Sequence, residues 1–138
     1  MTKTAHPIPL LKLALLADAV ASGATGLLLT FGASFLAGFL GLPAELLLYS
    51  GLFFLPWALI VAYVGTRATI LPRAVWPIAI LNLLWTVDSF AFLAMRDPAP
   101  SALGIAFVTF QALVVLAFAI AQIMGIQRQN ANRSPQAA

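Results

Sequence analysis

The residue with the clearest capacity for chemistry is Asp18, an acid inside a long apolar stretch at residues 10–30. Only three hydroxyl residues, Ser22, Thr25 and Thr30, interrupt the later part of this stretch. At about 1.5 Å per residue, a helix here places the carboxyl group roughly 9 Å inside a membrane. Because a charge at that depth is expensive, we expect Asp18 to face protein and not lipid.

Amide side chains in two later apolar stretches are candidates to meet this acid. Asn82 lies about nine residues from Arg73 and Gln122 about six from Arg128, so at ~1.5 Å per residue both reach a depth similar to that of Asp18. Such groups would otherwise expose hydrogen-bonding atoms to hydrocarbon. We therefore expect Asp18, Asn82 and Gln122 to form one polar layer.

Helical spacing adds further polar residues to the same faces. Ser22 and Thr25 follow Asp18 at i+4 and i+7, and Thr86 and Ser89 follow Asn82 in the same way. In the fourth apolar stretch, Gly104, Gln111, Gln122 and Gly125 fall on one stripe. These faces are expected to meet at the axis of a helical bundle.

Two interpretations of the polar layer remain open. In one, amide and hydroxyl groups link the helices and serve only to hold them together. In the other, Asp18 is a proton or cation site with Asn82, Gln122 and Trp85 as its walls, which the absence of a Lys or Arg at that depth favours.

Asp88 is the second acid inside an apolar stretch, about eight residues from Arg96 and therefore in the opposite half of the membrane. It is expected either to pair with Tyr49 or to be reached by water from outside, and a solvated acid is favoured over a catalytic one. The aromatic residues of the second apolar stretch are expected to serve in packing and at the interface and not as a ligand cage: Phe53, Phe54, Trp57 and Tyr63. The candidate intramembrane polar site comprises Asp18, Ser22, Thr25, Asn82, Trp85, Asp88, Gln111 and Gln122.

Enzymatic, metal and cofactor chemistry have no recognisable signature. The chain has no cysteine and a single histidine, His6, in the N-terminal tail. The sequence also lacks an acid pair on one helical turn and a glycine-rich phosphate loop. We expect no enzymatic activity, no cofactor and no metal.

Composition indicates that the solvent of most of the chain is lipid. Of the 138 residues, 62% are hydrophobic and 8% charged, with a mean hydropathy of +1.02. A soluble domain is about half apolar and a quarter charged. The net charge of +3 comes from basic residues scattered at helix ends, so it predicts no nucleic-acid partner.

Charges, prolines and turn residues divide the chain into four membrane-spanning helices in one all-α domain, residues 1–126. The first helix is expected to end near residues 30–33. Residues 34–42 are then a short interfacial segment, as a separate helix or as a continuation of a long tilted one. The other helices are expected at 43–66, 72–95 and 102–126, with Ser101 as the cap of the last, and 127–138 as a disordered cytoplasmic tail.

The distribution of basic residues predicts orientation. Four spans place both termini on one side, and that side carries all but one of the seven Lys and Arg residues, the exception being Arg96. The positive-inside rule makes this side cytoplasmic, in a bacterial inner membrane. Residues 3–21 imitate a signal peptide, but an acid directly before the cleavage position predicts that the segment is retained.

In outline, an acid in the first helix and Trp85 in the third resemble the small multidrug resistance transporters, which carry Glu where this chain has Asp18. The phrases Ala17-Asp18-Ala19-Val20-Ala21-Ser22-Gly23 and Leu81-Asn82-Leu83-Leu84-Trp85 are more similar to small uncharacterised four-helix bacterial inner-membrane proteins. This second resemblance spans most of the chain and implies a fold without a function.

Two functions follow from these observations. The first is a non-enzymatic accessory or assembly subunit that packs against a membrane-protein partner or a second copy in the lipid bilayer. The second is a small transporter or channel for protons or cations that uses Asp18, which requires a water-accessible path to that residue.

Overall fold

A computed structural model describes residues 8–133 as four helices: α1 (Leu10–Leu40), α2 (Ala44–Gly65), α3 (Pro72–Met95) and α4 (Ala102–Arg133). Each helix is long and apolar enough to cross a membrane. The predicted all-α four-helix bundle is confirmed, and the chain is an integral membrane protein. The predictions for residues 1–7, including His6, and for 134–138 lie outside the described residues.

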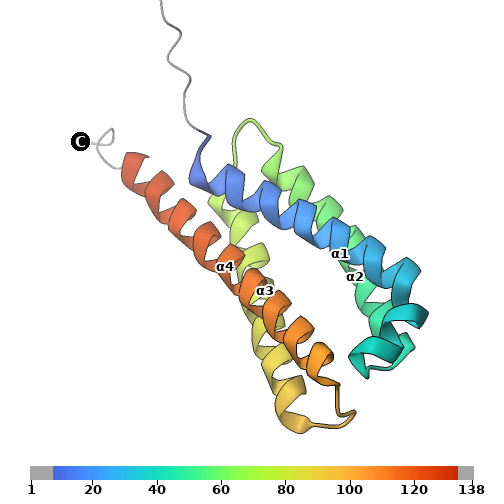
Figure 1. Cartoon of the computed structure of the whole chain (residues 1–138). Coiled ribbons are helices and arrows are strands. Elements are labelled where there is room, and N and C mark those ends of the chain that lie inside the picture. Colours follow the sequence, from blue (N-terminus) through green and yellow to red (C-terminus); the bar gives the residue numbers. More distant parts are fainter. Residues whose placement is uncertain (1–7, 134–138) are drawn as a thin grey trace, which may run out of the picture.

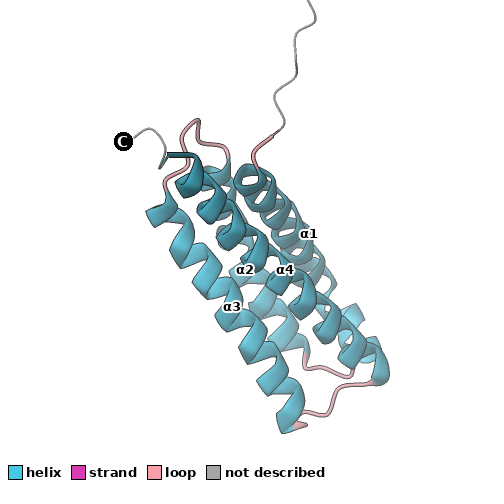
Figure 2. Ribbon diagram, turned by 90° about the vertical axis from the view of Figure 1, so that its left-hand side faces the viewer, coloured by secondary structure: helices cyan, strands magenta, loops and turns pink. Residues whose placement is uncertain are grey.

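The helices form two antiparallel hairpins, α1–α2 and α3–α4, which pack together through α1 and α4 (Figure 1). Both described ends of the chain lie at the same end of the bundle, here named the terminal end (Figures 1 and 2). Around the bundle the order is α2, α1, α4, α3, and the backbones of α2 and α3 approach each other at few points. The bundle is therefore least closed between α2 and α3.

The first helix continues beyond its predicted end near residues 30–33, so that expectation is wrong and the alternative of one long helix is correct. Its 31 residues span roughly 46 Å, more than a hydrocarbon core of about 30 Å. The carbonyl groups of Phe39 and Leu40 accept hydrogen bonds from the Ser101 side chain and backbone, at 2.7 and 2.9 Å. Gly41 ends the helix with a φ of 64°, which suits glycine.

The fourth helix also runs further than predicted, through Arg133 instead of ending at Ile126. Residues 127–133 of the predicted disordered tail are thus helical. Gln129 Nε2 donates a 2.8 Å hydrogen bond to the carbonyl oxygen of Ile70 in the α2–α3 connection. This contact ties the added helical turns to the bundle. At the start of α4 the predicted cap is confirmed, since Gly104 N donates to Ser101 Oγ at 3.1 Å.

Small residues allow close packing of α1 against both neighbours. A Cβ atom on Gly51 of α2 would lie 2.6 Å from the backbone nitrogen of Thr30 and 3.0 Å from the carbonyl oxygen of Gly26. On the other side of α1, a Cβ on Gly125 of α4 would lie 2.8 Å from the Cα of Leu11. These two contacts fix the position of α1, and with it that of Asp18.

An apolar plug closes the terminal end of the bundle. It consists of side chains from three helices that are at most 3% exposed: Leu11, Leu15, Val75, Ile78 and Ile126. Because these side chains come from the first turns of α1 and α3 and from the later part of α4, they lie between the terminal end and the polar layer.

Candidate functional site

The carboxyl group of Asp18 is the centre of a buried polar layer. Its Oδ2 accepts hydrogen bonds from Asn82 Nδ2 and Gln122 Nε2, both at 2.8 Å, and its Oδ1 accepts one from Ser22 Oγ at 3.0 Å. Asn82 Nδ2 also donates to Gln122 Oε1 at 3.2 Å. The predicted meeting of Asp18, Asn82 and Gln122 is confirmed.

This layer is buried, and no basic side chain among residues 8–133 takes part in it. Asp18 is 1% exposed and Gln122 0% exposed. All three donors to the carboxyl group are neutral, and no ion pair reaches Asp18 within residues 8–133. The layer links α1, α3 and α4 at one depth, and Ser22 completes it from the next turn of α1.

A second polar group lies around Gln111 on α4. Gln111 Oε1 accepts a 2.8 Å hydrogen bond from Trp85 Nε1, and its Nε2 donates to Ser89 Oγ at 3.1 Å and to the carbonyl oxygen of Val108 at 3.0 Å. The sequence places Trp85 beside Asp18, but its indole nitrogen is engaged here instead. The predicted polar face of α3 therefore serves two separate hydrogen-bonded groups.

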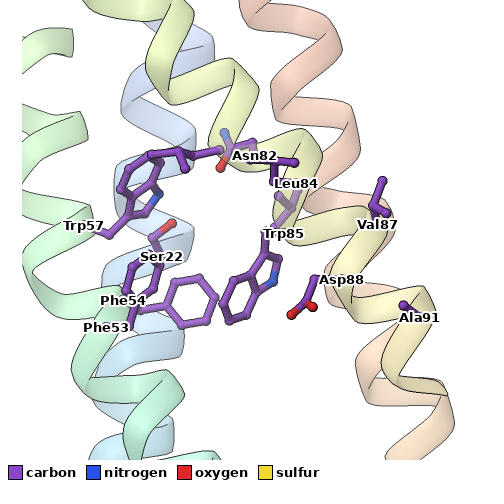
Figure 3. A pocket seen from close by; sticks show the side chains of 12 residues that line it. Ser22, Phe53, Phe54, Trp57, Asn82, Leu84, Trp85, Val87, Asp88 and Ala91 are labelled. Carbon is purple, nitrogen blue, oxygen red and sulfur yellow. The ribbon is translucent and has the colours of Figure 1, made fainter. Parts of the chain in front are cut away.

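A cavity of about 490 Å³ lies between α2 and α3 (Figure 3). Ser22 and Asn82, which both bind Asp18, line it, and Asp88 lines it further along α3. Asp18 itself is not among the lining residues. The remaining lining residues are Phe53, Phe54, Trp57, Leu81, Leu84, Trp85, Val87, Ala91 and Val115.

Aromatic rings connect α2 to α3 across this cavity. Phe53 is stacked on Trp85 with 5.7 Å between ring centroids and an interplanar angle of 1°, and on Trp57 at 6.1 Å and 14°. Phe54 meets Trp85 edge-on at 4.8 Å. The expectation of packing for these rings is met, but they also form the wall of a cavity, which their sequence positions did not indicate.

A smaller cavity of about 250 Å³ continues away from the terminal end and shares Phe54, Trp85 and Asp88 with the first. Thr25 and Ser50 line it, together with Ser89 and Gln111 of the second polar group. Thr25 therefore does not belong to the Asp18 layer, although it follows Asp18 at helical spacing.

Asp88 differs from Asp18 in exposure and in hydrogen bonding. It is exposed, lines both cavities, and makes no side-chain hydrogen bond or ion pair to any residue between 8 and 133. No hydrogen bond joins its side chain to that of Tyr49, so the expected pair of these two residues has no support among the contacts of residues 8–133. At about 1.5 Å per residue Asp88 lies roughly 10 Å from the end of α3 at Met95.

The arrangement offers a hydrogen-bonded acid, an unpaired acid and aromatic surfaces. Within the described part of the chain, no group of three or more His, Cys, Asp or Glu side chains could hold a metal ion. Comparisons with protein-family models, curated proteins and solved structures gave no match.

Proposed function

We propose that the protein is a non-enzymatic accessory or assembly subunit of a membrane complex, which offers a preassembled four-helix bundle to another membrane protein. The observation that carries this proposal is the closed Asp18 layer. A carboxylate has about four acceptor positions, and the three donors fill most of them. Such an arrangement suits an acid that holds helices together.

The same observation favours this function over ion transport through Asp18. A transported ion needs an open position at the acid and access from both sides of the membrane. Asp18 is 1% exposed, and the apolar plug of Leu11, Leu15, Val75, Ile78 and Ile126 lies between it and the terminal end. A subunit with a structural role requires neither.

The proposal includes a bacterial inner membrane with both termini in the cytoplasm. Support comes from the basic residues at the terminal end, where Lys12 Nζ donates to the carbonyl oxygen of Arg67 at 3.3 Å and Arg67 lies over the ring of Tyr63 at 4.1 Å. These contacts gather positive charge at one end of the bundle, which supports the proposed orientation through the positive-inside rule.

The test is the state of the full chain in its native membranes. After mild detergent extraction, native mass spectrometry is expected to find it in a complex of fixed stoichiometry with at least one different membrane protein. Recovery of the chain only as a monomer or only with lipid contradicts the accessory function.

A second candidate, a proton or small-cation carrier, is favoured by one observation: Ser22 and Asn82 both contact Asp18 and line the larger cavity. Water that entered this cavity would be separated from Asp18 by only one residue, Ser22 or Asn82. Liposomes that contain the purified protein and a pH-sensitive dye separate the two functions. Proton or cation flux that Asp18→Asn abolishes supports the carrier; flux equal to that of empty liposomes supports the accessory subunit.

A further inference from the structure

The unpaired acid at the α2–α3 opening is the feature that the Asp18 layer does not explain. Asp88 lies within a membrane-spanning helix, is exposed, and has no hydrogen-bond or ion-pair partner among residues 8–133. A carboxylate at such depth is costly unless a positive group or water covers it. Among residues 8–133 no positive group lies nearby, because the Lys and Arg residues in this range all lie near helix ends or in connections.

We propose that a basic side chain from a transmembrane helix of a different protein enters the larger α2–α3 cavity and pairs with Asp88. The proposal rests on the accessory function and names the chemistry of the partner. The partner helix lies along the opening between α2 and α3, where this bundle has the fewest backbone contacts of its own.

The cavity walls suit the apolar stem and the charged head of such a side chain. The faces of aromatic rings attract cations, most strongly those of Trp. Phe53, Trp57 and Trp85 lie nearly parallel, and Asp88 lines the same cavity three residues along α3 from Trp85 (Figure 3). A volume of about 490 Å³ falls within the range of pockets that accept small ligands, so one long side chain fits.

Trp85 is held in place before any partner arrives. Its Nε1 donates to Gln111 Oε1 at 2.8 Å, and Phe54 contacts it edge-on at 4.8 Å between centroids. A wall fixed in this way loses little conformational freedom on binding, which favours affinity.

A second copy of the chain does not satisfy the same requirement. A symmetric contact across the α2–α3 opening would bring together two Asp88 carboxylates, and like charges repel most strongly where the dielectric constant is low. Acyl chains of lipid would fill the volume but leave the charge unpaired. A partner with a Lys, Arg or protonated His in its membrane span removes the cost.

The test uses a photoreactive amino acid in the full chain in its native cells, at Val87 on the cavity wall and, in separate variants, at two controls. The controls, Val20 on α1 and Phe110 on α4, are 72% and 70% exposed on other faces. We expect Val87 to crosslink to one membrane protein whose crosslinked helix carries a basic residue. Asp88→Lys should lower the crosslink about tenfold, and a change of that basic residue to Asp should restore it.

The control for a general effect of charge reversal is Asp97→Lys, in the α3–α4 connection, which should leave the Val87 crosslink unchanged. A crosslink from Val87 to lipid alone, to a second copy, or to a helix without a basic residue overturns the inference. If another protein crosslinks only at Val20 or Phe110, the accessory function stands and this docking site fails. If no protein crosslinks at any of the three positions, both fail.

Discussion

Asp18 and Asp88 lie in membrane-spanning helices of the same bundle but have opposite surroundings. Asp18 is buried and accepts hydrogen bonds from Ser22, Asn82 and Gln122. Asp88 is exposed in the α2–α3 opening. Hydrogen bonds between helices in membranes contribute about 0.6–2 kcal/mol each, so the first acid stabilises the bundle, whereas the second is available to another molecule.

The contacts of Asp18 could be predicted because depth and helical spacing are properties of the sequence. Depth counted from the basic residues Lys12, Arg73 and Arg128 placed three polar groups at one level, and a polar group in hydrocarbon needs a partner. The separate group around Gln111 could not be predicted, because Trp85 can reach either level. Which level the Trp85 side chain reaches depends on the rotation and tilt of α3 against α4.

At Asp18 we expect Asn to be tolerated better than Leu. Asn keeps an oxygen that accepts from the facing amides, so Asp18→Asn should melt within a few degrees of the wild type in detergent. Asp18→Leu leaves the amides of Asn82 and Gln122 unpaired, at a cost of about 1–3 kcal/mol for each buried group. Thermal unfolding followed by circular dichroism measures the order. A more stable Leu variant would show that the polar layer contributes nothing to the bundle.

At the scale of the helices, the sequence predicted that four helices exist better than it predicted how long each helix is. α3 matches its predicted bounds and α2 differs by one residue at each end. α1 and α4 are longer than predicted, because contacts distant in the sequence hold their last turns: Ser101 with Phe39 and Leu40, and Gln129 with Ile70. Local periodicity carries no information about such contacts.

Gly51→Ala tests the close crossing of α1 and α2. The added methyl group meets backbone atoms of Thr30 and Gly26, so the helices must separate, and overpacking of this kind costs about 1–3 kcal/mol. The matched control is Gly38→Ala, because nothing lies within 4 Å of that position. The melting temperature should fall for the first variant and hold or rise for the second. Equal melting temperatures would contradict the crossing.

Ser101→Ala tests the junction between α4 and the end of α1. It removes the cap of α4 and the hydrogen bond to Phe39, with an expected loss of about 1 kcal/mol from the cap. Backbone amides near the end of α1 should exchange hydrogen faster, as mass spectrometry of exchanged peptides can measure. Ser34→Ala, at an exposed position on α1, is the control. Unchanged exchange in Ser101→Ala would mean that α1 is helical to Leu40 without this contact.

At the scale of the whole molecule, the sequence did not predict the opening between α2 and α3. Four apolar stretches predict a bundle but not which neighbours touch. The order α2, α1, α4, α3 depends on close helix crossings, where Gly51 and Gly125 allow α2 and α4 to approach α1. Phe53, Phe54 and Trp57 line a cavity because the backbones of α2 and α3 lie apart.

The orientation in the membrane can be tested with single cysteines, since the natural chain has none. Thr69 lies in the α2–α3 connection at the terminal end and Ala99 in the α3–α4 connection at the opposite end. In intact cells, a membrane-impermeant thiol reagent should label Ala99→Cys and not Thr69→Cys, because the proposed orientation puts the positively charged end in the cytoplasm. Labelling of Thr69→Cys alone would invert the orientation.

The division of roles between the two acids is tested most directly by the fraction of the chain that migrates with its partner. That fraction can be measured on native gels of membranes from cells that carry the wild type, Asp18→Asn or Asp88→Asn at equal levels of folded chain. We predict that Asp18→Asn leaves it close to the wild-type value, while Asp88→Asn lowers it about tenfold. A loss of complex in Asp18→Asn with Asp88→Asn unchanged would contradict the account.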